Sequence, residues 1–263
     1  MRGPRLGVCC LALVALPVCS EALEAKRVEL PVVTDGHGLE PITTDLGYEI
    51  ELSSGLVVAD DLQFAIAGEA HASWLHWLSD AIVPRAHAHP GHFQAGEVTG
   101  ELAGHFLLRF VSGEEHEVGM ATLLVGKYQS ANLMFARAGE ADVEQDHPLL
   151  GHTALLSGSA TRDGSTIQFT VSIDSPQDRE LVGIPFAVDV TESSRGPLAL
   201  RLLTRDPLEN DTLFDGIDFA QLDFDADGRV DIEQASPDTA SAAACNTIRR
   251  VLQTHDHFSV QPR

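Results

Sequence analysis

The sequence predicts a mainly β protein: an antiparallel β-sandwich with Greek-key-like connections, one short helix and a C-terminal helix. In many short segments apolar and polar residues alternate, as at Phe169, Val171 and Ile173, which places one face of each segment in a core. Turn-forming residues separate these segments. The regular alternation of strands and helices that is typical of a doubly wound parallel sheet is missing from the sequence.

The elements can be assigned in order along the chain. A tight hairpin is expected at 162–165, where Asp163-Gly164 stands between two alternating segments. Helical segments are expected at 70–83, 215–222 and 238–254, and the last has an apolar stripe. The predicted strands cover 28–33, 48–53, 56–67, 97–102, 105–111, 118–125, 131–137, 153–160, 166–173, 184–191, 198–204 and 257–260.

Residues 1–22 have the composition of a secretory signal peptide, with cleavage after residue 22 or, alternatively, after Ala25. Arg2 and Arg5 precede a short apolar run, and small residues follow it. The run is shorter than the roughly 20 apolar residues that a membrane-spanning helix needs. We therefore expect no transmembrane segment, a single folded domain over 26–263, and a location in the periplasm or outside the cell.

The cysteines raise one alternative for the N-terminus. Cys19 stands where a bacterial lipoprotein carries its lipid-modified cysteine, but the preceding residue should be small, and Val18 is not. This argues against lipid anchoring. Cys245 is the only cysteine left after cleavage, so an internal disulfide is excluded. A chain of about 240 residues can bury enough apolar surface to fold without one.

The charge balance excludes some partners. The chain has 39 acidic and 17 basic residues, which gives a net charge of −22. Nucleic acids are bound through clustered Lys and Arg, so a nucleic-acid partner is not expected. An acidic surface instead attracts cations and keeps the protein soluble.

An acidic segment, 223–231, has the spacing of a calcium-binding loop. Carboxylates at alternate positions can converge on one ion, and Gly228 permits the sharp bend that this needs. Over these nine residues the segment resembles EF-hand and dockerin-like loops, although the twelfth position is Gln234 and not Glu. The expected role of calcium is structural. The expected ligands are Asp223, Asp225, Asp227, the backbone carbonyl of Arg229, and Asp231.

Twelve histidines are present, and several are grouped. In an extended segment His87 and His89 point the same way, and the Pro-Gly turn after them can bring His92 back toward both. Imidazole suits zinc and copper equally, so the metal is left open. Lone histidines such as His105 and His116 are expected to be structural or exposed. The predicted transition-metal ligands are His87, His89, His92, His147, His152, His255 and His257.

Together these patterns predict an exported metal-binding protein that holds zinc or copper at the histidines and calcium at the acidic loop. A binding protein is favoured over an enzyme, because the sequence has no Gly-x-Ser-x-Gly and no His-Glu-x-x-His motif. Two alternatives stay open: a secreted recognition module for protein or glycan with structural calcium, and a metal-dependent hydrolase. A pH-sensing role is a further alternative for the histidines.

Overall fold

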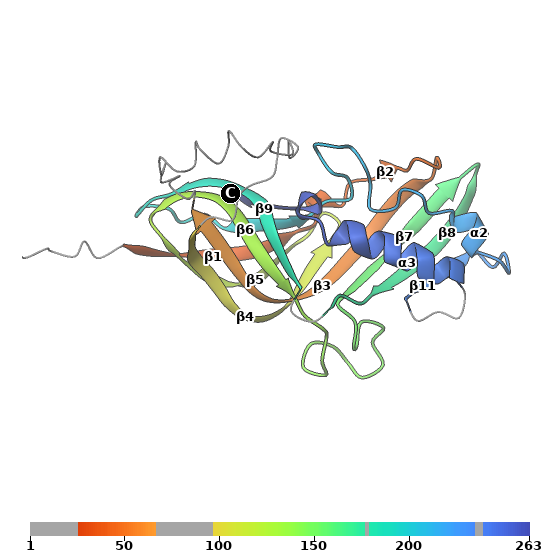
Figure 1. The fold of residues 1–263 in the computed structure, drawn as a ribbon, viewed down its shortest axis with the longest axis horizontal. Helices are drawn as coiled ribbons and strands as arrows, with labels where there is room; N and C mark the ends of the chain where they lie inside the picture. The colour runs from red at the N-terminus through yellow and green to blue at the C-terminus, as the bar shows by residue number, and fades with distance from the viewer. Residues whose placement is uncertain (1–25, 67–96, 177–178, 235–238) are drawn as a thin grey trace, which may run out of the picture.

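The computed structural model describes residues 26–66, 97–176, 179–234 and 239–263, and most of these residues lie in strands (Figure 1). The mainly β class is therefore confirmed. The expected signal peptide at 1–22 and the helix expected at 70–83 fall outside the described residues. The strands are β1 Arg27–Asp35, β2 Ile42–Thr43, β3 Glu49–Ile66, β4 Glu97–Val111, β5 Glu115–Leu124, β6 Gly126–Phe135, β7 Ala154–Arg162, β8 Ser165–Ile173, β9 Glu180–Val190, β10 Leu198–Leu202, β11 Arg229–Glu233 and β12 Phe258–Pro262.

Helical elements are few in the described part of the chain. They are α2 (Phe219–Leu222), α3 (Thr239–Leu252) and two short 3-10 turns, η1 (Gly36–Gly38) and η2 (His255–His257). The segment of α3 is rich in alanine, which favours a helix, and its buried face carries apolar residues at helical spacing. This face packs on β8 and β11 (Figure 1). Both helices lie within the segments predicted to be helical.

All twelve strands belong to one mixed sheet, in the order β11-β8-β7-β3-β4-β5-β1-β10-β12, with β2, β6 and β9 attached beside this path. Most pairs are antiparallel, as expected. Two pairs are parallel: β1 with β10, and β8 with β11. The finer prediction of a Greek-key sandwich stays a prediction.

β3 is 18 residues long and connects the two halves of the sheet. One of its edges pairs with β4 from residue 54 to residue 66. Its other edge changes partner: residues 49–57 pair with β7, and residues 59–66 pair with β6. The segment 136–153 leaves the sheet where β6 ends and returns where β7 begins, so it projects from this junction (Figure 1).

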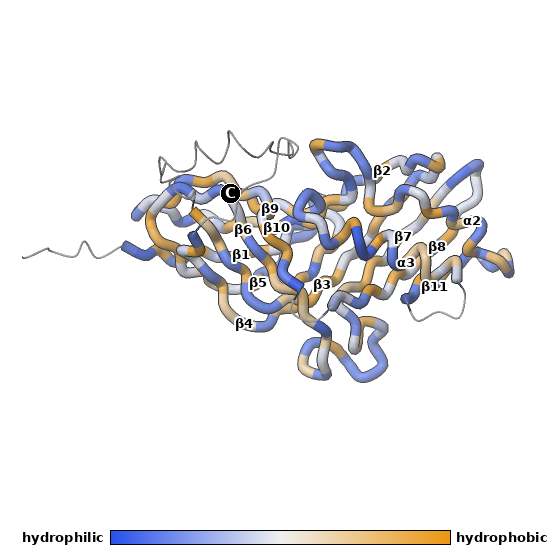
Figure 2. The backbone as a smooth tube through the Cα atoms, viewed as in Figure 1, coloured by the Kyte–Doolittle hydropathy of each residue, from blue (hydrophilic) through white to orange (hydrophobic). Residues whose placement is uncertain are grey.

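Each half has its own set of packed aromatic rings. In the half formed by β1, β4, β5, β6 and β9, the ring centroids of Phe64 and Phe186 lie 5.3 Å apart. In the half formed by β7, β8 and β11, the ring of Phe219 lies 5.0 Å from that of Phe169 and 5.3 Å from that of Tyr48. Figure 2 shows apolar and polar residues alternating along the strands, which is the pattern that predicted them.

Two glycines explain why the predicted strands were too short. β3 and β4 were each predicted as two strands, with breaks near Gly55 and Gly104, but both run on as single strands. A Cβ on Gly55 would lie 2.8 Å from Cδ2 of Leu202, so glycine here allows close packing. Gly104 has a φ of +131° and faces a bulge in β3. Both residues therefore mark close approach or a bulge in a strand, and not a turn.

We predict that Gly55→Ala lowers the free energy of unfolding by about 1–3 kcal/mol, because Leu202 must move to make room for the methyl group. Gly126→Ala is the matched control, since its new Cβ would have no neighbour closer than 3.5 Å. The control should change stability by less than about 0.5 kcal/mol. Urea denaturation of the two variants tests this, and equal stability for both would contradict it.

Candidate functional site

The acidic loop lies between α2 and β11 and is curled by its own backbone. Ala226 and Gly228 adopt positive φ angles of 56° and 78°. The amide of Gly228 donates to the carboxylate of Asp223, at 3.2 Å from Oδ2, and the amide of Arg229 donates to Oδ1 of Asp227 at 2.8 Å. These contacts turn the chain back on itself within six residues, as the Asp-Gly pattern predicted.

The curl brings three carboxylates together. One oxygen from each of Asp223, Asp225 and Asp227 lies within 4.8 Å of the others. Asp225 and Asp227 are exposed and Asp223 is half-buried. Across the described residues, no Lys, Arg or His lies within 4.0 Å of these three carboxylates, and their mutual repulsion favours a bound cation.

The other two expected calcium ligands lie on the strand that follows. Arg229 is the first residue of β11, and Asp231 is paired with Thr170 of β8. The side chain of Asp231 is exposed and does not belong to the close group of three carboxylates. No strand was predicted between residues 204 and 257, so β11 was missed, because its first three residues belong to the loop motif at 223–231.

The predicted transition-metal ligands are only partly described. His87, His89 and His92 lie outside the described residues. His147 and His152 lie in the segment 136–153, where His147 Nδ1 accepts from the amide of Leu149 at 3.1 Å, and His152 Nδ1 lies 2.9 Å from Oδ1 of Asp174. These contacts tie both rings to their immediate surroundings.

His255 and His257 lie in η2, just before the last strand. His255 Nε2 lies 3.0 Å from Oδ1 of Asp256, and His257 is buried with its Nδ1 2.9 Å from the carbonyl oxygen of Leu203. Over the described ranges, His147, His152, His255 and His257 form no close group of three ligands.

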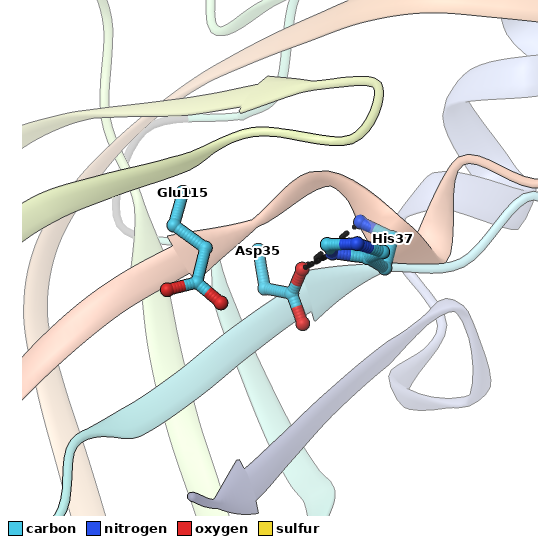
Figure 3. Close-up of side chains that lie close together, drawn as sticks. All are labelled: Asp35, His37 and Glu115. Carbon is cyan, nitrogen blue, oxygen red and sulfur yellow. Dashed lines mark hydrogen bonds and ion pairs between the residues drawn. The ribbon is translucent and has the colours of Figure 1, made fainter.

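A second close group, which the sequence reading did not identify as a site, joins Asp35, His37 and Glu115 (Figure 3). Asp35 ends β1 and is completely buried. Its Oδ1 accepts from the amide of His37 at 3.0 Å and lies 2.6 Å from Nδ1 of the same ring. Figure 3 shows Glu115 on the neighbouring strand, beside this pair.

Two arginines decide the role of this group. Arg201 Nε donates to Oδ2 of Asp35 at 2.6 Å, Arg263 donates to the same oxygen, and Arg263 also pairs with Glu115. Burial alone would raise the pKa of Asp35, but the donors of His37 and Arg201 outweigh it and lower the pKa to about 2. Two guanidinium groups already neutralise the carboxylates, so a metal ion is disfavoured. We interpret this group as a structural clamp.

The third close group is Asp206, Glu209 and Asp211, in the connection after β10. Asp206 is buried, and its Oδ1 accepts from the amide of Leu208 at 2.6 Å. The pKa of Asp211 is raised by burial and by the neighbouring acidic residues, while His257 acts in the opposite direction. His257 is thus close enough to interact electrostatically with this group.

His105 is held between two carboxylates at a bulge in β3. Its Nδ1 lies 2.5 Å from Oδ1 of Asp60, and its Nε2 lies 3.0 Å from Oδ2 of Asp142. Burial alone would lower the pKa of His105, but these two contacts outweigh it and raise the pKa. The ring therefore connects β3 to the projecting segment 136–153, which is the structural role expected for a lone histidine.

Comparison of the chain with protein-family models, with curated proteins and with solved structures found no significant match. In the described part of the chain, no helix combines the length and the apolar character needed to cross a membrane. The site must therefore be interpreted from its own geometry.

We predict that the clamp at Asp35 makes stability depend on pH. The pKa of about 2 in the folded protein lies below the ordinary value of 3.8, so unfolding takes up a proton as the pH falls through this window. The clamp should contribute roughly 2 kcal/mol above about pH 4, and this should be lost by about pH 2. Asp35→Asn should remove this part of the pH dependence in urea denaturation.

Glu115→Gln is the matched control for the clamp. Glu115 shares Arg263 with Asp35, but its side chain is 38% exposed. An exposed pair contributes at most about 1 kcal/mol, so this variant should keep most of the wild-type stability and pH profile. The interpretation fails if Glu115→Gln costs as much as Asp35→Asn.

Proposed function

We propose that this protein is an exported metal-binding protein and that Asp223, Asp225 and Asp227 hold a calcium ion. The observation that supports this is the convergence of three carboxylate oxygens within 4.8 Å, in a loop whose spacing predicted it. The absence of a basic partner among the described residues strengthens the case, since it distinguishes this group from the clamp at Asp35.

The ligand chemistry favours calcium over a transition metal. All three converging atoms are carboxylate oxygens, which hard cations prefer, and no imidazole or thiol belongs to this group in the described residues. Two of the side chains are exposed, so water can complete the six to eight ligands that calcium takes. Extracellular calcium sites have dissociation constants of about 0.1–1 mM, and we expect an affinity in this range for the loop.

Calcium bound at this loop would stabilise the fold. The loop leads directly into β11, which pairs with β8 at the edge of the sheet, and the amide of Gln168 in β8 donates to the carbonyl of Gly228 at 2.9 Å. A cation that neutralises the three carboxylates removes their repulsion and holds the start of β11 in place. Because calcium would bind the folded protein and not the unfolded chain, it would raise the free energy of unfolding by mass action.

The transition-metal part of the proposal rests on the density of histidines at His87, His89 and His92 in the sequence. Imidazoles this close in the chain can share an ion at small entropic cost, and zinc and copper both fit.

The two alternative functions, a recognition module and a hydrolase, are each tested by a different measurement. A recognition module on a Greek-key sandwich would bind protein or glycan with calcium alone, and a hydrolase would turn over ester or phosphate substrates until a chelator is added.

We predict that saturating calcium raises the Tm of chelator-treated protein. A hundredfold excess over the dissociation constant contributes about 2.7 kcal/mol, which corresponds to roughly 5–10 °C for a domain of this size. Differential scanning calorimetry measures the shift. Unchanged Tm at 10–20 mM calcium, on the order of ten times the weakest extracellular dissociation constant, would rule out the site.

Matched variants distinguish calcium binding at the loop from a nonspecific effect of calcium on an acidic protein. Asp225→Asn should abolish most of the calcium-induced shift, because it removes one charged ligand from the group. Asp163→Asn removes the same charge from an exposed hairpin turn, where φ is +53°, and should leave the shift unchanged. Equal shifts in the two variants would attribute the effect of calcium to nonspecific screening.

We further predict that zinc or copper binds tightly to the wild-type protein and at least tenfold more weakly when His87, His89 and His92 are all changed to Ala. Isothermal titration of the calcium-loaded protein gives both affinities. Changing His116 to Ala is the control, since it removes a histidine of β5 that is not one of the predicted ligands and whose Nε2 lies 3.4 Å from Glu114. Identical binding by the triple variant and the wild type would exclude this cluster.

A further inference from the structure

The partner change along β3 creates a crevice in the middle of the sheet. β7 pairs with β3 up to Val57 and β6 begins to pair at Ala59, so the ends of these two strands separate at this point. β8 ends beside the start of β7, because Ile173 pairs with Ala154. β8 and β11 are parallel, so their carboxyl ends lie at the same edge of the sheet. Strand ends and α3 therefore surround one hollow region.

Two adjoining cavities occupy this region. One has a volume of about 220 Å³ and is lined by Asp60, His105 and Thr153, among others. The other has a volume of about 420 Å³ and is lined by Asp174, Gln234 and Arg249. Arg137, Ser175 and Pro176 line both cavities and form the boundary between them.

The larger cavity, which we call the arginine cavity, is lined by two guanidinium groups from different elements. Arg249 comes from α3, and Arg137 follows β6. The Nε of Arg249 is buried and has no hydrogen-bond partner among the described residues, while one of its terminal nitrogens donates to Oδ1 of Asn246 at 3.1 Å. The guanidinium of Arg249 therefore keeps hydrogen-bonding capacity that the described residues do not use.

Among the described residues, one carboxylate, that of Asp174, lines the same cavity, and it does not cancel the charge of both arginines. Asp174 lies 2.9 Å from Nδ1 of His152 and 3.9 Å from a terminal nitrogen of Arg137, so its charge is shared between two partners. Arg249 has no ion pair in the described part of the chain. Among the described residues that line it, the cavity thus has two arginines against one aspartate, in a protein whose net charge is −22. This excess disfavours a metal ion there.

We propose that the arginine cavity binds a small oxyanion, a carboxylate or a phosphate group, between Arg137 and Arg249. A guanidinium donates two parallel, charge-assisted hydrogen bonds to such groups, whereas a metal ion accepts none and a neutral ligand brings no opposite charge. Ser175 Oγ accepts from Gln253 at 2.7 Å, so its own hydrogen is available to donate into the cavity. The amide of Gln234 adds a neutral donor at the rim. This site is independent of the calcium loop.

The test is titration of inorganic phosphate and of succinate into the purified protein in a buffer without added calcium. At least one anion should bind with a dissociation constant of a few millimolar or less, and the tighter of the two identifies the source as a phosphate or an organic acid. Arg249→Gln should weaken this binding about tenfold or more, because it removes a charge-assisted donor pair.

Arg250→Gln is the matched control, since Arg250 is exposed on the same helix and does not line the cavity. It should bind the anion within about twofold of the wild type. Arg249→Gln should lower the Tm only slightly, because it removes one hydrogen bond to Asn246 on the same helix and an Nε that has no partner among the described residues. Arg137→Gln provides a second test from outside the helix. The Asp225→Asn variant should bind the anion normally, which separates this proposal from the calcium site.

The proposal is overturned by any of three results. The first is no binding of either anion by the wild-type protein at tens of millimolar. The second is unchanged binding in both Arg249→Gln and Arg137→Gln. The third is an equal loss in Arg249→Gln and Arg250→Gln, which would attribute binding to the general charge of the helix.

Discussion

The hydrogen-bond ladder along both edges of β3 is the constraint on which the rest of the structure depends. Because one 18-residue strand pairs with β4 along one edge and with β7 and then β6 along the other, the two halves of the sheet cannot separate without breaking the strand pairing. The same partner change explains the irregular features nearby. The segment 136–153 leaves the sheet there, His105 links it back to Asp60, and the strand ends leave the crevice that Arg137 lines.

Local patterns in the sequence predicted much of this fold, and long-range pairing limited the rest. The alternation at Phe169, Val171 and Ile173 correctly predicted β8, and Asp163-Gly164 correctly predicted the hairpin before it, since both signals lie within a few residues. Gly55 was read as a break because its reason, the side chain of Leu202, lies far away in the chain. The parallel pairs could not be predicted for the same reason, because the local pattern of a strand does not identify the strand with which it pairs.

The same distinction separates the candidate sites. The acidic loop was predictable because its carboxylates stand at alternate positions within five residues, and backbone turns alone bring them together. The clamp at Asp35 was not, because its arginines are 166 and 228 residues away and only the folded sheet brings them there. Similar residue types thus lie in opposite surroundings. The carboxylates of the loop have no basic partner among the described residues, whereas Asp35 accepts hydrogen bonds from two arginines and connects three strands.

The parallel pairing of β1 with β10 also determines when this chain is able to fold. β1 is the first described strand, yet Arg201, which binds Asp35 at its end, is made only after 166 further residues. Closing so large a loop costs entropy before any contact repays it, so folding of this half is slow and must await the last third of the polypeptide. A ribosome-bound chain therefore leaves its first strand without one neighbour, a state that exposes a strand edge to aggregation.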